Sequence, residues 1–191
     1  MTIKKNFFTT SPVIIAPILY GLAVYSSLPN KMTTHWGFTN QPDGFMAKPL
    51  LVFGLPLLML VFQFIVLFAT GHSKDDATRL NYIVMWLLPL VTVVAYLTTI
   101  QFNLGTTLDI RRIATLLVAI IFLSMGNYLP TVTLSDQSRR QPKNPTRFYH
   151  RIGYLLVGGG LALLVSLLFG PWVSTVILGL VIVGLIAVIS L

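Results

Sequence analysis

Six apolar runs, separated by shorter polar segments, account for most of this chain. A helix of about 20 apolar residues is long enough to cross the ~30 Å hydrocarbon core of a bilayer. The pattern therefore predicts an all-α, polytopic integral membrane protein that forms a single transmembrane domain over residues 1–191. The six predicted spans are 7–28, 49–70, 80–100, 110–129, 153–169 and 172–191.

Two longer polar segments, residues 29–48 and 131–151, interrupt the apolar pattern. If the N-terminus is cytoplasmic, nine of the thirteen Lys and Arg residues fall in cytoplasmic segments and four fall outside. Cytoplasmic loops of membrane proteins carry this kind of basic excess. We therefore expect both termini in the cytoplasm, an extracytoplasmic loop at 29–48 and a basic cytoplasmic loop at 131–151.

The loop 29–48 has the residues of a segment with one defined shape. Leu28-Pro29 ends the first apolar run, because proline cannot continue a helix and restricts the residue before it. The stretch from Thr33 to Gly37 is expected to be extended. The sequence Asn40-Gln41-Pro42-Asp43-Gly44 then predicts a turn.

Three roles are open for His35 in this loop. It could hydrogen-bond the loop backbone, form part of a ligand- or peptide-binding surface, or act as a metal ligand or general base. The candidate residues for binding or for shaping the loop are His35, Trp36, Gly37, Asp43, Gly44 and Lys48. One His and one Asp are too few for a well-defined transition-metal site, so we expect the loop-shaping role first and no metal.

The composition excludes several classes of chemistry. The chain has no Cys, and its five carboxylate side chains are all Asp. Disulfides, thiolate catalysis and Cys-ligated metals are therefore excluded, as is the HExxH helix of zinc hydrolases. We predict no catalytic residues, no cofactor and no enzymatic activity.

The net charge of +8 is weaker evidence for nucleic-acid binding than it would be in a soluble protein. Only 9% of the residues are charged and 55% are hydrophobic, so the basic excess is expected to serve cytoplasmic loops and anionic lipid, with no nucleic acid involved. The basic cytoplasmic surface either anchors its loop at the membrane, which we favour, or docks a cytosolic partner. Its residues are Arg139, Arg140, Lys143 and Arg147. The polar residues Gln63 and Asn127, in or near spans, are expected to hydrogen-bond neighbouring helices.

Three motifs resemble those of a known bacterial family. LPNKMTTHWGFTNQPDGFMAKP resembles the "LP…HW…G…DG…K" loop after the first helix of SdpI-family membrane proteins. MGNYLP and YHRIGYLLVGG resemble the "GNY.P" helix end and the "THR..GG" helix start of the same family. The positions carried over in the first loop are Pro29, His35, Trp36, Gly37, Asp43, Gly44 and Lys48. In the second half they are Gly126, Asn127, Tyr128, Pro130, His150, Arg151 and Gly153.

The resemblance implies a polytopic helical protein that protects a producer's membrane from its own secreted peptide toxin. In the type system of the family, the protein also senses the peptide and captures a cytosolic repressor at the membrane. The chain departs from the family between its last two motifs, where TVTLSDQSRRQPKNPTRFYHR replaces a longer segment containing "N..GIRTPWTL". The departure weakens the expectation of repressor capture more than that of toxin immunity.

We therefore expect a non-enzymatic immunity protein whose partners are membrane lipid, a secreted peptide toxin outside and, if signalling is retained, a cytosolic regulatory protein. The alternative is a small transporter, flippase or channel component for a lipid or small solute. That alternative predicts a cavity lined by Gln63, Asn127 and Asp109. Transport sites usually need ionisable residues within the spans, and few occur here.

Overall fold

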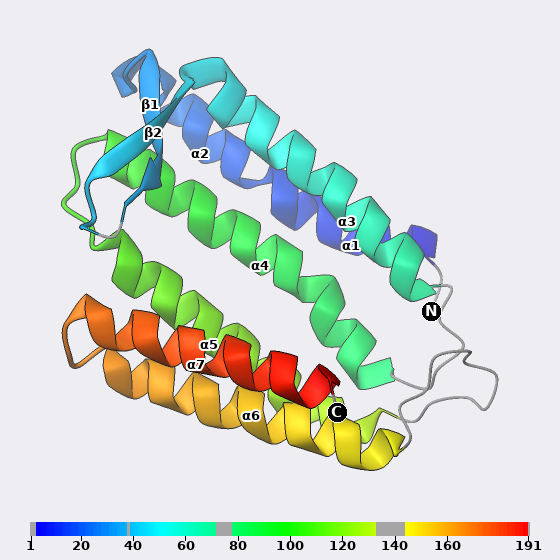
Figure 1. Cartoon of the computed structure of the whole chain (residues 1–191). Helices are drawn as coiled ribbons and strands as arrows, with labels where there is room; N and C mark the ends of the chain where they lie inside the picture. Colours follow the sequence, from blue (N-terminus) through cyan, green and yellow to red (C-terminus); the bar gives the residue numbers. More distant parts are fainter. Residues whose placement is uncertain (1–2, 38, 72–77, 133–143, 191) are drawn as a thin grey trace. The chain divides into compact units, whose positions relative to one another are not determined.

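The computed structural model describes residues 3–37, 39–71, 78–132 and 144–190, and these residues are mostly helical (Figure 1). The α-helices are α1 (Ile3–Ile15), α2 (Pro17–Ala23), α3 (Leu55–Gly71), α4 (Thr78–Asn103), α5 (Ile110–Tyr128), α6 (Pro145–Ser166) and α7 (Pro171–Ser190). Shorter helical turns are η1 (Tyr25–Ser27), η3 (Leu129–Thr131) and the π-helical η2 (Leu50–Gly54). Strands β1 (Lys31–Trp36) and β2 (Pro42–Ala47) form a hairpin.

Six helical segments in the described part of the chain are long and apolar enough to cross a membrane, which confirms the predicted all-α architecture. They cover residues 3–23, 50–70, 79–103, 110–131, 145–166 and 171–190. The hairpin is the one departure from an all-helical chain among the described residues.

The fifth span begins eight residues earlier than the expected residue 153. Pro145 occupies the first turn of α6, where its missing N–H costs nothing, and the side-chain oxygen of Asn144 accepts a hydrogen bond from the backbone N–H of Arg147 at 3.1 Å. Residues 145–151 of the expected basic loop are therefore helical. The Asn-Pro pair is the sequence signal that marks this helix start. The other residues of the basic surface, Arg139, Arg140 and Lys143, lie outside the described residues.

Contacts between residues group the chain into two compact units. Unit 1 comprises residues 1–72 and 85–110, which hold α1, α2, the hairpin, α3 and most of α4. Unit 2 comprises residues 73–84 and 111–191, which hold the start of α4 together with α5, α6 and α7. The single transmembrane domain over 1–191 stays a prediction.

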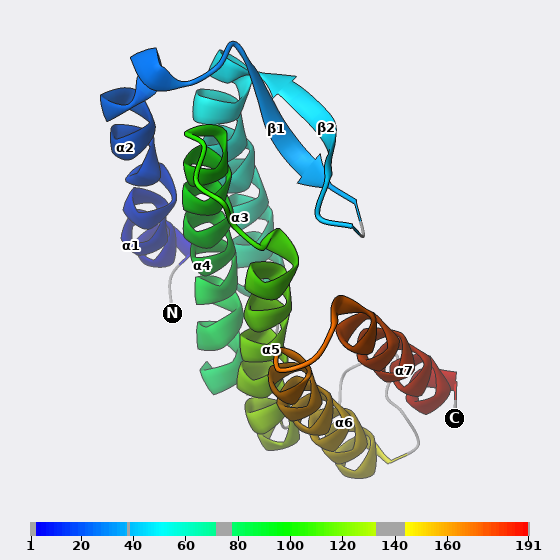
Figure 2. The same ribbon diagram turned by 90° about the vertical axis from the view of Figure 1, so that its left-hand side faces the viewer.

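In unit 1, α1 lies against α3 (Figures 1 and 2). The rings of Phe7 and Phe64 meet edge to face with their centroids 6.0 Å apart. The core consists of Leu28, Met32, Leu51, Val52, Tyr96 and Ile100. Because it contains a residue of β1 together with residues of η2 and α4, the hairpin and the helices share one core.

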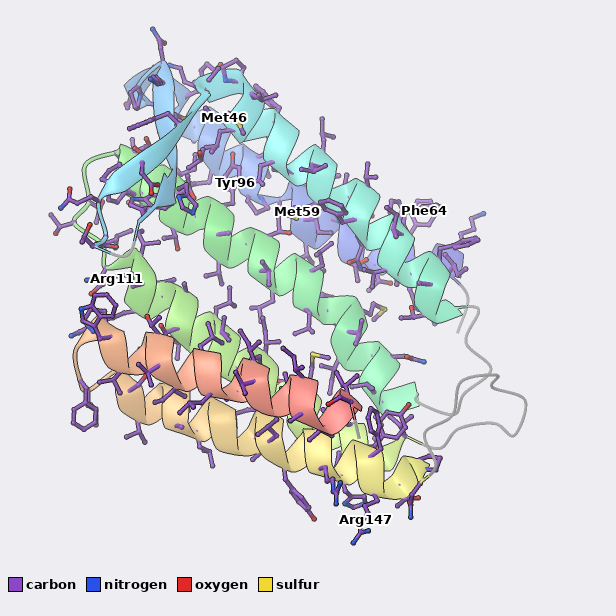
Figure 3. The ribbon with its side chains drawn as sticks, in the orientation of Figure 1. Met46, Met59, Phe64, Tyr96, Arg111 and Arg147 are labelled. Carbon is purple, nitrogen blue, oxygen red and sulfur yellow. The ribbon has the colours of Figure 1, made fainter. Side chains whose placement is uncertain are left out.

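Two of the prolines inside the spans, Pro56 and Pro89, leave a backbone carbonyl without its helical donor, and in each of these two cases a neighbouring helix supplies one. Pro89 cannot donate to the Met85 carbonyl four residues earlier, and the Gln63 side chain of α3 donates to that carbonyl at 3.0 Å. Pro56 leaves the Val52 carbonyl in the same way, and the Tyr96 hydroxyl of α4 donates to it at 3.3 Å; Figure 3 labels this tyrosine. The prediction that Gln63 bonds a neighbouring helix is thereby confirmed. No water competes for backbone groups inside a bilayer, so these side-chain donors are what make the prolines tolerable.

In unit 2, glycines let helices approach one another closely. A Cβ added at Gly153 of α6 would lie 2.8 Å from the Gly126 carbonyl of α5, and one at Gly159 would lie 2.5 Å from the Val181 side chain of α7. Small residues at such crossings allow backbones to pack in lipid, where van der Waals contact replaces the hydrophobic effect. The Ser166 and Ser174 hydroxyls, 2.7 Å apart, add a hydrogen bond between α6 and α7.

Candidate functional site

The polar loop after the first span folds into an antiparallel hairpin. Thr33 pairs with Phe45, His35 with Gly44 and Trp36 with Pro42, with irregular register on either side of His35. The predicted extended stretch 33–37 therefore largely coincides with β1.

The turn of the hairpin lies earlier than predicted. The expected turn at residues 40–44 is wrong, because Pro42 and Asp43 already belong to β2. The turn lies between Gly37 and Gln41, whose backbone groups are joined by a 2.9 Å hydrogen bond, and Asn40 adopts the left-handed conformation with φ of 61°. Asn tolerates that conformation, and Pro is tolerated at the first residue of a strand.

His35 and Asp43 meet across the hairpin near its tip. His35 Nδ1 lies 2.5 Å from Asp43 Oδ1, and the two side chains are 72% and 52% exposed. Gly44 stands opposite His35, and a Cβ there would lie 2.7 Å from the His35 Cβ. A Cβ at Gly37 would lie 3.1 Å from Asp43 Oδ2. The two glycines thus make room for the His–Asp pair, which faces the surroundings.

Lys48 closes the base of the hairpin. Its Nζ donates to the carbonyls of Leu28 at 2.8 Å and Tyr25 at 3.2 Å, and lies 4.8 Å from the centre of the Tyr25 ring. Tyr25 begins the short turn η1 and Leu28 directly follows it, so Lys48 links the end of β2 to both sides of this turn. The Lys48 backbone N–H also donates to the Asn30 carbonyl at 2.9 Å. Lys48 therefore shapes the loop.

Asn103, at the end of α4, holds the middle of the hairpin. Its Oδ1 accepts from the Thr33 N–H at 2.8 Å and its Nδ2 donates to the Thr33 carbonyl at 2.9 Å, so the amide pairs with β1 as another strand would. Nδ2 also donates to the Thr99 carbonyl at 2.8 Å. The adjacent Phe102 ring meets Trp36 edge to face, with the ring centres 5.0 Å apart.

Asn40 holds the tip of the hairpin in a similar way. Its Nδ2 donates to the Leu108 carbonyl at 3.1 Å, and its Oδ1 accepts from the Ile110 N–H at 3.0 Å. Together, Lys48, Asn103 and Asn40 fix the base, middle and tip of the hairpin. Sequence reasoning missed both asparagines as anchors, since only their positions in polar segments set them apart.

Two comparisons with known proteins bear on this hairpin. The profile of a domain family described as a domain of unknown function, DUF1648, matches residues 13–60, which include both strands. The immunity protein SdpI of Bacillus subtilis (strain 168) is 24% identical to this chain over 195 residues, covering 96% of this chain and 91% of the relative. The chain is therefore similar to SdpI over nearly its whole length. No solved structure matches it.

Similarity to SdpI over nearly the whole chain, together with six described helices that are long and apolar enough to cross a membrane, makes this chain a multi-pass protein of the bacterial cell membrane. The SdpI-family residues of the first loop all lie in unit 1, and those of the second half in unit 2. In the first loop, the hairpin brings His35, Gly37, Asp43 and Gly44 together at its tip and places Lys48 at its base.

The SdpI-family residues at the end of α5 and the start of α6 serve mainly to pack these helices. A Cβ at Gly153 would lie 2.7 Å from the Pro130 ring, and a Cβ at Gly126 would lie 2.8 Å from the Gly153 carbonyl. Asn127 and Tyr128 instead line an open pocket of about 340 Å³ together with Leu123, Ser124 and Val157.

The basic residues of the SdpI-family motif lie on the first turns of α6. Arg147 and Arg151 are exposed, and the His150 ring lies 5.8 Å from the Tyr154 ring. Figure 3 labels Arg147 on this helix. This end of α6 therefore presents positive charge, which suits either an anionic lipid surface or a protein partner.

The residues expected for a transport cavity have different surroundings. Gln63 is fully buried, and its Nε2 donates to the Thr10 hydroxyl at 2.9 Å as well as to Met85. Asn127 is exposed and lines the pocket of unit 2. Gln63 therefore acts as a helix-to-helix bond within unit 1.

Proposed function

We propose that this protein is a non-enzymatic immunity protein of the SdpI family that protects a bacterial membrane from a secreted peptide toxin. The observation that carries the proposal is the hairpin, which is anchored at base, middle and tip while His35, Asp43 and most of β2 stay exposed. A surface held in advance in one shape binds with a smaller entropic cost. The similarity over nearly the whole length of an immunity protein supports the same role.

The proposal requires the hairpin to face the outside, where a secreted peptide arrives. The distribution of basic residues supports an N-terminus and C-terminus in the cytoplasm, and with that orientation the hairpin would be outside. Three of the six spans separate the hairpin from the start of α6, so these two segments lie on opposite faces of the membrane.

Labelling of single cysteines tests this orientation directly, because the chain has no cysteine of its own. We expect a membrane-impermeant maleimide to label Gln41→Cys but not Thr146→Cys in intact cells; both positions are exposed. After permeabilisation both variants should react, which controls for accessibility. Labelling of Thr146→Cys alone in intact cells would reverse the orientation and remove the hairpin from the toxin's side.

Survival of toxin-sensitive cells tests the proposed immunity. The host is a Bacillus subtilis strain that lacks its own SdpI, challenged with the secreted toxin of that species and, separately, with the secreted peptides encoded beside the gene of this chain. We expect the wild-type protein to raise the lethal dose of at least one peptide by roughly tenfold or more over that of empty-vector cells. Equal killing of expressing and empty-vector cells by all of them contradicts the proposal.

The exposed His35–Asp43 pair supplies a matched variant for the same assay. Exposed ion pairs contribute little to stability, so His35→Ala should leave the hairpin folded. If His35 touches the peptide, protection falls while the melting temperature stays that of the wild type. Full protection by His35→Ala assigns the residue to shaping the loop.

We also propose, as a finer part of the function, that peptide binding is signalled to a cytosolic repressor. The exposed Arg147 and Arg151, four residues apart on α6, support a docking surface on the cytoplasmic face. A fluorescently tagged repressor of the B. subtilis system, expressed in the same cells, should move to the membrane when toxin is added. A repressor that stays in the cytosol of protected cells restricts the function to immunity.

A further inference from the structure

The two outer edges of the hairpin differ, and the contacts of Thr33 show how. Both the N–H and the C=O of Thr33 bind the Asn103 side chain, so both point away from β2. In an antiparallel pair, opposite residues either exchange both hydrogen bonds or exchange none. Thr33 and its partner Phe45 are therefore a pair without mutual hydrogen bonds.

It follows that the backbone groups of Phe45 also point outward, on the far edge of β2. The same alternation applies two residues along, where Ala47 pairs with Lys31. Figure 2 shows β2 on the side of β1 that is turned away from α4. The outward N–H and C=O of Phe45 and the outward N–H of Ala47 have no hydrogen-bond partner among the described residues, whereas the Ala47 C=O faces the first turn of the helix that follows β2. The edge of β1 is closed by Asn103, whereas the edge of β2 is open.

The open edge lacks the features that usually block strand addition. Natural edge strands are protected by lysines, prolines, bulges or a covering element. Pro42 and the irregular register opposite His35 protect only the first half of β2, and the stretch from Phe45 to Ala47 carries no lysine or proline and pairs regularly. Phe45 and Met46 are 49% and 37% exposed, and Figure 3 labels Met46 on this strand. The Nζ of Lys31 lies 4.8 Å from the centre of the Phe45 ring, which places one positive charge on that face of the sheet.

We propose that the open edge of β2 binds the secreted peptide as an added β-strand, which rests on the immunity function proposed above. The N–H and C=O of Phe45 and the N–H of Ala47 would pair with an extended segment of the peptide, as in other cases of strand addition. The segment should be apolar, to lie beside Phe45 and Met46. It should carry no basic residue on the face that holds Lys31.

Charge and hydrogen-bonding chemistry favour this occupant over two others. A second copy of the chain, paired through its own β2, would bring a second Lys31 onto the same face of the sheet. Acyl chains of lipid offer no donors or acceptors for the open backbone groups. A peptide strand provides both at the two-residue spacing of the edge.

The variant Ala47→Pro tests the main-chain pairing. It removes the outward N–H of residue 47, and proline is tolerated on an edge strand when its missing N–H faces away from the partner strand. The matched control, Ala47→Thr, changes the side chain but keeps the N–H. In the survival assay, with the toxin that wild type neutralises, Ala47→Pro should lose at least tenfold in protective dose while Ala47→Thr keeps it. Both variants should be expressed and melt like wild type.

The outcomes separate this inference from the proposed function. If wild type protects and Ala47→Pro protects equally, the edge does not bind the peptide although the immunity function stands. Equal loss in both variants points to side-chain contact with lipid and also overturns the pairing. A wild type that protects against nothing removes the function and this inference together.

Disulfide cross-linking provides a second measurement on folded protein. The purified toxin that wild type neutralises is synthesised with single cysteines along its length and added to Phe45→Cys in membranes. Strand pairing predicts cross-links at alternate peptide positions, because side chains of a strand point to opposite faces in turn. Uniform or absent cross-linking overturns the inference. Efficient cross-linking of Met46→Cys to a second copy without toxin would identify the occupant as another copy of the chain.

Discussion

Replacing Asn103 by leucine is expected to detach the hairpin from α4 and to abolish protection against the toxin. Leucine has a similar size but cannot replace the three hydrogen bonds to Thr33 and Thr99. Thr33 is only 7% exposed, so its N–H and C=O would be left buried and unpaired. Each such group costs about 1–3 kcal/mol, and we expect a loss of at least ~2 kcal/mol in unfolding free energy. Thermal unfolding of the purified protein in detergent measures the loss.

Amide hydrogen exchange provides the local readout for Asn103→Leu. Exchange at Thr33 should accelerate strongly, while exchange in the middle of α3 should stay slow. Asn81→Leu is the matched control, because it makes the same change in the same helix. The Asn81 side chain forms no hydrogen bond with another described residue. Protection of Thr33 in Asn103→Leu equal to that of wild type would show that Asn103 does not anchor the hairpin.

Replacing Gly126 by alanine is expected to destabilise unit 2 by about 1–3 kcal/mol, the usual cost of overpacking. The new Cβ would lie 2.8 Å from the Gly153 carbonyl and 2.9 Å from the Val157 nitrogen. Both atoms belong to the backbone of α6 and cannot turn away as a flexible side chain would. The two helices would have to separate. Chemical denaturation in detergent, followed by circular dichroism, measures the effect.

Gly158→Ala is the control with the opposite expected sign. Nothing lies within 4 Å of a Cβ at Gly158, and alanine in place of glycine inside a helix stabilises by roughly 0.5–1 kcal/mol. The double variant Gly126→Ala with Gly153→Ala should lose less than the sum of the two single losses, because the first substitution already opens the crossing. Equal effects of Gly126→Ala and Gly158→Ala would contradict the close crossing of α5 and α6.

The hydrophobic pattern was sufficient to predict the six spans, because a bilayer imposes length and apolarity on each helix separately. It misplaced the start of α6. Residues 145–151 are polar, so the hydrophobic pattern assigned them to a loop, although Asn144 and Pro145 start a helix there. The turn of the hairpin was misplaced for another reason. Local turn propensity favours Pro42-Asp43-Gly44, but the bonds of Asn40 to Leu108 and Ile110 support a turn that contains Asn40.

The residues of the first loop were recognisable as a group from the sequence, yet their individual roles were not. Lys48 could have been a ligand-binding cation, and the structure shows it linking the end of β2 to both sides of η1. His35 and Asp43 could have been far apart, and the hairpin register brings them into contact. Register depends on the pairing of two strands, which no single residue in the loop determines.

The sequence by itself determined the class of protein, the number of spans, the absence of cysteine and glutamate chemistry, and the motifs of the SdpI family. These properties follow from composition and from patterns within about 20 neighbouring residues. Only the tertiary structure decided that Asn103 closes the edge of β1, that β2 is left open, and that Gln63 and Tyr96 fill the gaps made by Pro89 and Pro56. The physical reason is distance along the chain: these bonds join residues 22 to 70 positions apart, and only folding brings such groups together.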